Sequence, residues 1–194
     1  MKIATLSLVS AFVLVSASAF ADDSSNRSMD SGMQRQNMEQ KSGNMTDAQI
    51  IKVVQTNNEN EIAVSKVEKS QGKIDQAKKL AETVIKQNES SNKDLSKLAS
   101  KINVKPEETS VSKQSAEEAK TLNNDLSAMS GRALDRAYVE KQVQMNQTKL
   151  DQLDNQLIPQ AQNEALKAQL ETIRAKIAQN LQVAKAVQST VQKS

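Results

Sequence analysis

The chain has 194 residues and contains no Cys, no His and no Trp, with only three aromatic side chains. Its 26 Lys and Arg residues and 23 Asp and Glu residues leave a formal net charge of +3. These counts exclude Cys nucleophiles, Ser-His-Asp triads, His and Cys zinc sites, thiolate iron–sulfur clusters and haem with a His or Cys ligand, so no cofactor is expected. Nucleic acid is not expected as a partner, because Lys and Arg are not clustered and almost no rings are present on which bases stack.

Residues 1–21 have the pattern of a secretory signal peptide. Lys2 supplies the positive end, and the apolar stretch Ile3–Val15 is too short to span a bilayer comfortably. Ala19-Phe20-Ala21 matches an A-x-A site, which predicts cleavage before Asp22. The alternative is an N-terminal membrane anchor. No other stretch is apolar enough to span, so we expect a soluble mature protein without a membrane span, in the periplasm or secreted, with outer-membrane association as a further possibility.

Residues 22–45 are rich in Ser, Asn and Gln and lack apolar periodicity, which predicts a disordered linker. Four of the seven methionines of the chain lie in this segment: Met29, Met33, Met38 and Met45. Thioethers are soft ligands that suit Cu(I), and an exported protein can meet copper, so these residues are candidate copper ligands. The alternative is a linker in which methionine is enriched by chance.

From Thr46 to the C-terminus the chain predicts an all-α fold, because apolar residues recur at alternating steps of three and four. Thr46 or Asn44 is expected to cap the first helix, and Gly72, Ser130-Gly131 and Pro159 mark helix ends. The predicted helices span residues 47–70, 73–103, 112–129, 133–157 and 161–192.

Four long amphipathic helices with short connections favour an antiparallel four-helix bundle over residues 46–194, with one additional shorter helix. Isolated extended coiled coils are the alternative. The loops at 103–111 and 130–132, together with Pro159, indicate instead that the chain reverses its direction.

Each long helix carries one conspicuous polar residue within its apolar stripe: Glu61, Asn88, Asn146 and Asn180. An unpaired buried polar group costs roughly 1–3 kcal/mol, so these side chains should meet one another or water. If the helices are in register, they form one layer in which three amides donate to one carboxylate. Such a layer either sets the register of the helices, as a buried Asn does in coiled coils, or forms an unusual or vestigial ligand or metal site.

Several short stretches of the helical region also form a pattern, of which Gly131, Asp135 and Tyr138, in that order, are the most distinctive part. The stretches are Glu61-Ile62-Ala63-Val64, Ala77–Asn88, Ser130–Val139, Gln142-Val143 and Ile173–Val187. Through them, residues 46–190 resemble a bacterial family of exported ferritin-like proteins, catalogued as domain of unknown function 4142 and often labelled predicted outer membrane proteins.

The resemblance implies a ferritin-like bundle in which a glutamate at Glu61 is typical and the positions of Asn88, Asn146 and Asn180 are usually histidine. This chain has asparagine at all three positions. Because an amide oxygen is a weak ligand for transition metals compared with imidazole, metal binding is not carried over to this core.

These observations predict an exported, non-catalytic protein of the bacterial cell envelope with a structural or binding role. Its partner would be an envelope protein or a small ligand. The alternative is periplasmic metal handling, either of copper by the Met-rich segment or at a degenerate core site. An enzyme would have to use carboxylates, Lys or Tyr138 as acid–base groups, with Glu61 as the candidate in the core.

Overall fold

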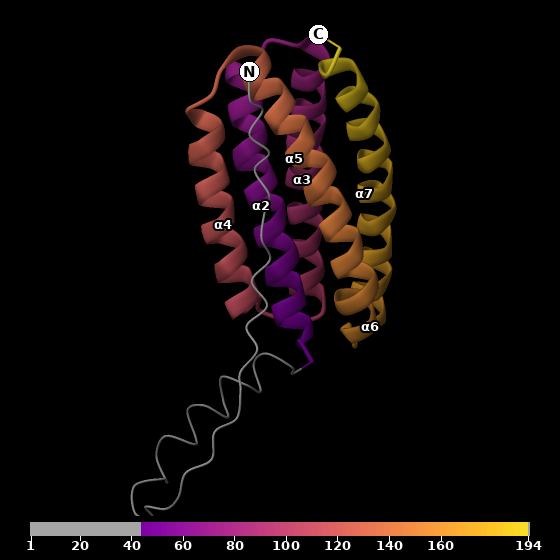
Figure 1. The fold of residues 1–194 in the computed structure, drawn as a ribbon. Coiled ribbons are helices and arrows are strands. Elements are labelled where there is room, and N and C mark those ends of the chain that lie inside the picture. Colours follow the sequence, from indigo (N-terminus) through magenta and orange to yellow (C-terminus); the bar gives the residue numbers. More distant parts are fainter. Residues whose placement is uncertain (1–43, 194) are drawn as a thin grey trace, which may run out of the picture. The chain divides into compact units, whose positions relative to one another are not determined.

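The computed structural model describes residues 44–193, and all regular structure in this range is helical. The five predicted helices are confirmed close to their expected bounds (Figure 1). They are α2 (Asp47–Gln71), α3 (Asp75–Lys101), α4 (Ser110–Ser127), α5 (Gly131–Gln152) and α7 (Glu164–Val191). A π-helix, η1 (Leu153–Leu157), and a short helix, α6 (Ile158–Gln160), connect α5 to α7. The predicted signal peptide and nearly all of the predicted linker lie outside the described residues.

Local side-chain chemistry explains both ends of α2. The Thr46 hydroxyl accepts from the backbone N–H of Gln49, and the Gln49 side chain accepts from the backbone N–H of Thr46. This capping box identifies Thr46, rather than Asn44, as the cap. Gly72 ends the helix as predicted, but its φ of −64° is accessible to any residue. The reason for glycine is spatial, because a Cβ at position 72 would overlap with both the side chain and the backbone carbonyl oxygen of Glu68.

The predicted break at Pro159 differs from the structure, in which the helical path continues to Gln160. Proline lacks an N–H and its ring clashes with the carbonyl four residues earlier, so a regular α-helix does not pass through it undisturbed. The turn before it widens: the Ile158 N–H bonds to the Leu153 carbonyl, with the five-residue spacing of a π-helix. The chain then reverses at residues 161–163, where the Asn163 side chain caps α7.

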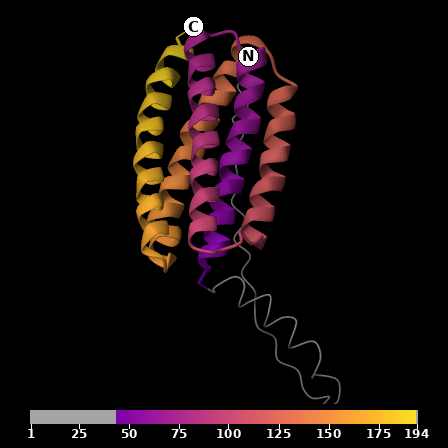
Figure 2. The same ribbon diagram turned by 180° about the vertical axis from the view of Figure 1, so that it is seen from behind.

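Helix α2 is the centre of the packing. It contacts α3, α4 and α5, and α7 packs against α3 and α5. Consecutive long helices run in opposite directions, so α4 runs parallel to α2 (Figures 1 and 2). Hydrogen bonds agree with this direction, because Ser115 near the start of α4 bonds to Asn57 and Asn60 of α2. At the other end, Leu126 packs in one cluster with Val67.

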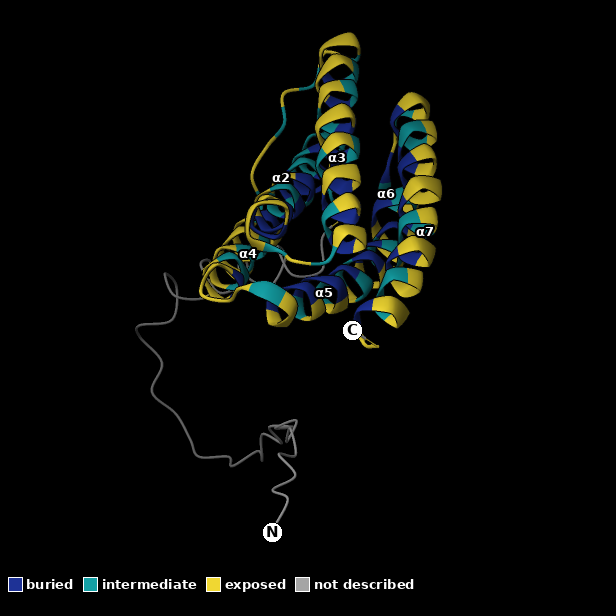
Figure 3. Cartoon of the chain, turned by 90° about the horizontal axis from the view of Figure 1, so that it is seen from above, coloured by how far each residue is buried: buried dark blue, intermediate teal, exposed yellow. Residues whose placement is uncertain are grey.

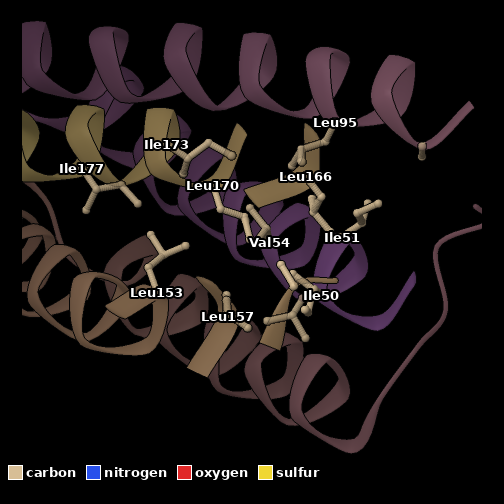
Figure 4. Packing of buried hydrophobic residues seen from close by; sticks show 13 residues of the cluster. Ile50, Ile51, Val54, Leu95, Leu153, Leu157, Leu166, Leu170, Ile173 and Ile177 are labelled. Carbon is tan, nitrogen blue, oxygen red and sulfur yellow. The ribbon is translucent and has the colours of Figure 1, made fainter. Parts of the chain in front are cut away.

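The core contains two apolar clusters, one toward each end of the helices. The first, here called the aliphatic cluster, lies around the N-terminal half of α2 and the π-helix, and Figure 4 shows its side chains meeting between the helices. It consists of Ile50, Ile51, Val53, Val54, Leu95, Ala99, Leu153, Leu157, Ala161, Leu166, Leu170, Ile173 and Ile177. The second, here called the mixed cluster, lies around the C-terminal end of α2. It consists of Val64, Val67, Ala77, Leu80, Ala81, Val84, Leu126, Leu134, Tyr138, Val139, Ala184 and Val191.

Most of the predicted inward positions are buried, and Figure 3 shows buried and exposed faces alternating around the helices. Met129, which the spacing also predicts to face inward, is exposed because α4 already ends at Ser127. On α7 Asn180 is only partly buried, whereas its neighbour Leu181 is buried. None of the described helices is both long and apolar enough to cross a membrane.

Candidate functional site

Glu61 lies on α2 between the two apolar clusters, and its side chain is only 3% exposed. Its Oε2 atom forms an ion pair with Nζ of Lys149 on α5, at 2.6 Å. The same oxygen accepts a hydrogen bond from Asn88 Nδ2 on α3, at 2.7 Å. Its Oε1 atom is buried and has no hydrogen-bond partner. Three helices therefore meet at one buried carboxylate, which is compensated by a full positive charge and one amide.

The predicted single layer of three amides around Glu61 does not form. Asn88 does bond to Glu61, as expected. Asn146 is buried, but its Nδ2 donates to the carbonyl oxygen of Gln142 one turn earlier on α5. Asn180 donates to Gln87 Oε1 of α3. The structure thus brings two of the four predicted side chains together. Asn146 bonds within its own helix, and Asn180 stays apart because α7 presents Leu181 rather than Asn180 to the interior.

Lys149 is the functional side chain that the sequence reasoning missed. It follows Asn146 by three residues and precedes Leu153 by four, so helical spacing places all three on one face. This spacing is the one feature of the sequence that could have placed Lys149 on the buried face. Lysine is normally assigned to the solvent-exposed face, since it is almost never fully buried unless it is paired. Its pairing with Glu61 is a tertiary contact that one helix cannot reveal.

Buried polar groups continue from Glu61 along the contact between α2 and α5. We call this set the polar seam: Glu61, Ser65 and Glu68 of α2, with Asp135, Tyr138, Gln142, Asn146 and Lys149 of α5. Within it, the Tyr138 hydroxyl and Ser65 Oγ form a hydrogen bond of 2.9 Å. Burial is the main cause that raises the pKa of Tyr138 well above its ordinary value, and the carboxylates of Glu61 and Glu68 raise it further.

At the end of the polar seam, Glu68 and Asp135 form a pair of fully buried carboxyl groups. Asp135 Oδ1 accepts from the backbone N–H groups of Lys73 and Ile74, so this side chain caps the start of α3. Neither oxygen of Glu68 has a hydrogen-bond partner, and neither does Asp135 Oδ2. Two carboxyl groups at such a site satisfy one another only when one of them carries a proton.

The protonation of this pair follows from its surroundings. The pKa of Glu68 is raised from 4.5 to about 8, and burial is the largest cause. The negative charge of Asp135, and the hydrogen bond that a protonated Glu68 can donate to Asp135, raise the pKa further. The ammonium group of Lys78 acts against this shift. Glu68 therefore holds the shared proton at neutral pH. Two of the three most distinctive residues of the sequence pattern belong to this seam. Tyr138 bonds to Ser65 within it, and Asp135 joins its end to the start of α3.

A groove of about 860 Å³ runs between α4 and α5, with Asn57 and Asn60 of α2 also lining it. Lys149 lines this groove as well, so the buried ion pair lies directly beneath it. The remaining lining is rich in amide and hydroxyl side chains, among them Gln114, Ser115 and Thr148. Its size and its several polar side chains make the groove the candidate ligand site.

Metal ligands were also predicted in the N-terminal segment. Met29, Met33 and Met38 lie outside the described residues. Met45 packs against the aliphatic cluster, and its backbone N–H bonds to Gln160 Oε1. Copper binding by these methionines therefore stays a prediction. Among the described residues, no group of three or more Asp or Glu side chains is placed to hold a metal ion.

The fold and site define an all-helical bundle protein with a buried, charge-compensated polar seam. The sequence model of the family described as "Domain of unknown function (DUF4142)" matches residues 32–187, and the chain belongs to this family. The match begins within the predicted linker and extends to near the end of α7. Comparison with curated proteins gives no match. Comparison with solved structures gives none either.

Proposed function

We propose that this chain is an exported, non-catalytic protein of the bacterial cell envelope that binds a small ligand. The observation that carries the binding role is the groove between α4 and α5, which combines many amide, hydroxyl and charged side chains with a few apolar ones. Export is supported by the signal-peptide pattern of residues 1–21. The groove has the size of a small-molecule site.

The non-catalytic assignment is supported by the way in which the acid–base groups of the core are engaged. Glu61 is paired with Lys149, and the Tyr138 hydroxyl is bonded to Ser65. Glu68 is paired with the Asp135 carboxyl group and is fully buried. A general acid or base must reach the proton that it transfers. Of these groups only Lys149 lines the groove, and its ammonium group is already bonded to Glu61.

The arrangement of the helices is proposed to be ferritin-like. In this assignment α2, α3, α5 and α7 are the four bundle helices, and α4 is the additional helix on the far side of α2. The contacts of α2 with α3 and α5, and of α7 with the same two helices, support it. The Lys149 ammonium then provides, inside the bundle, the positive charge that Glu61 requires.

The binding role is tested by identifying what the protein retains. The protein is purified natively from a periplasmic fraction, and small molecules released on denaturation are identified by mass spectrometry. We expect a compound that is retained by the wild type and strongly depleted in Ala119→Trp, because the indole would fill the groove. Ala175→Trp, at an exposed position of α7, is the matched control. No difference between these variants would contradict the binding role.

Export is tested on the same sample. N-terminal sequencing is expected to begin at Asp22. A chain that retains residues 1–21 in the membrane fraction would contradict cleavage and favour the membrane anchor.

A further inference from the structure

The groove between α4 and α5 is elongated along the helices. Its lining extends from Val111 to Asp125 on α4 and from Lys141 on α5 to Gln156 on η1. At 1.5 Å of rise per residue, each wall is roughly 20 Å long. Asn57 connects the two walls at one level, since it bonds to Ser115 on α4 and to Gln152 on α5. An elongated groove of this kind fits a linear ligand better than a compact one.

The groove carries an excess of negative charge. Glu118, Asp125 and Asp151 line it, and within the described residues none of these carboxylates lies within ion-pair distance of a basic side chain. Lys141 lines the groove and contributes one positive charge. Lys149 is already neutralised by Glu61. A chain with a net charge of +3 thus has a groove in which acidic groups outnumber free basic ones.

The three carboxylates do not converge on one point. Glu118 and Asp151 each lie within one helical turn of the level at which Asn57 connects the two walls. Because α4 and α5 run in opposite directions, Asp125 lies toward the other end of the groove. A divalent cation needs several oxygen ligands around a single point, and no group of three or more carboxylates among the described residues is placed to hold one. Carboxylates at both ends of the groove suit several separate positive charges on one ligand.

Between the carboxylates the lining includes apolar side chains. Ala119 and Leu122 of α4 and Met145 of α5 contribute to it, and Val111 lies at one end. These side chains match methylene groups in chemical character, and the amide oxygens beside them accept hydrogen bonds from N–H donors. No aromatic side chain lines the groove, so a nucleobase or an aromatic ligand would find nothing on which to stack.

We propose that this groove binds a linear aliphatic polyamine, which is a chain of methylene groups that carries two or more ammonium groups. The ammonium groups would lie against Glu118, Asp125 and Asp151, and the methylene segments would cover the apolar lining between them. This inference rests on the proposed binding role of the groove and names its ligand class.

Isothermal titration calorimetry of the purified protein with spermidine, a linear triamine, tests the proposal. We expect saturable binding that weakens with added salt, because charge pairing at a solvent-exposed site is screened. The double variant Glu118→Gln/Asp151→Asn is expected to bind spermidine roughly three- to tenfold more weakly. The matched control is Glu171→Gln, at an exposed position of α7 outside the groove, which should bind as the wild type does.

Two further probes test the methylene chain and the positive charges separately. Octane-1,8-diol has the methylene chain without the charges, and magnesium chloride supplies positive charge without the methylene chain. Neither is expected to bind at concentrations that saturate spermidine. Equal binding of magnesium, or unchanged spermidine affinity in the double variant, would overturn the proposal. If spermidine fails while a retained compound is still lost in Ala119→Trp, the groove is a binding site for another ligand class. If both fail, the binding role itself is wrong.

Discussion

The aliphatic cluster and the polar seam both use α2, but different forces stabilise them. In the aliphatic cluster every buried side chain is apolar, and each gains stability by leaving water, whichever neighbour covers it. In the polar seam each buried group depends on a particular partner, such as Lys149 for Glu61 or Asp135 for Glu68. Loss of one partner there leaves an uncompensated charge or polar atom. The stability that the aliphatic cluster contributes should therefore be independent of pH, whereas the stability that the polar seam contributes should change with pH.

The largest expected effect comes from removing one member of the buried ion pair. Lys149→Met leaves the Glu61 carboxylate with Asn88 as its only bonded partner, and should reduce the free energy of unfolding by about 3–5 kcal/mol in urea titrations. The double variant Glu61→Leu/Lys149→Met removes both charges and should recover most of this loss. Lys113→Met breaks the exposed pair with Glu108 and should cost less than about 1 kcal/mol. A small effect of Lys149→Met alone would show that the pair is not buried in solution.

Truncating a side chain of the aliphatic cluster should lower the free energy of unfolding by a similar amount, but through a different mechanism. Leu170 is fully buried on α7, and Leu170→Ala is expected to lower the free energy of unfolding by about 2–5 kcal/mol through lost burial and the cavity left behind. We expect this loss of stability to be the same at pH 6 and pH 8, because no titratable group belongs to the aliphatic cluster. A loss that changes with pH would contradict the distinction between the two regions.

The carboxyl pair at the end of the seam should make stability dependent on pH. Folded Glu68 keeps its proton up to about pH 8, whereas the unfolded chain loses it near the ordinary pKa of 4.5. The folded state binds more protons in this window, so stability should fall as the pH rises from 4.5 to 8, by at most about 1.4 kcal/mol per pH unit. Above pH 8 the fall should level off.

Glu68→Gln tests this origin of the pH dependence. An amide at position 68 can donate to Asp135 without a titratable proton, so the variant should lose most of the slope and exceed the wild type in stability at pH 8. Glu82→Gln, at an exposed position of α3, should keep the wild-type slope. Melting temperatures between pH 5 and pH 9 measure both. An unchanged slope in Glu68→Gln would assign the pH dependence to other groups.

The smallest effects concern the two glycines of the bundle. Gly72→Ala places a methyl group where the Glu68 carboxyl lies and should cost about 1–3 kcal/mol through overpacking. Gly131→Ala meets no neighbouring atom, but its φ of 60° is left-handed and should cost about 1–2 kcal/mol of backbone strain. Combining each change with Glu68→Ala separates the mechanisms by urea titration. The truncation should relieve part of the loss in Gly72→Ala, because the Glu68 carbonyl oxygen remains 2.6 Å from the added Cβ, and it should relieve none of the loss in Gly131→Ala. Equal relief at both positions would contradict the spatial reason for Gly72.

The sequence predicted only part of the candidate site, and the remainder was missed for identifiable physical reasons. Glu61 and Asn88 were found because polar residues interrupt apolar stripes at helical spacing. Asn180 was misplaced because a stripe that steps by three and four drifts around a helix, and a shift of one residue put Leu181 inside instead. Glu68 and Ser65 went unnoticed because α2 is covered by three neighbours and buries more than one face.

By itself, the sequence determined the helices, their approximate ends and the face that each of them buries. Those properties depend on local caps, on proline and glycine, and on a periodicity that every helix carries within itself. Only the tertiary structure decided which polar groups compensate one another. Lys149 meets Glu61 across 88 positions of the chain, and Asp135 caps a helix that begins 60 residues before it. Such pairings depend on the relative rotation and register of packed helices, which no single helix specifies.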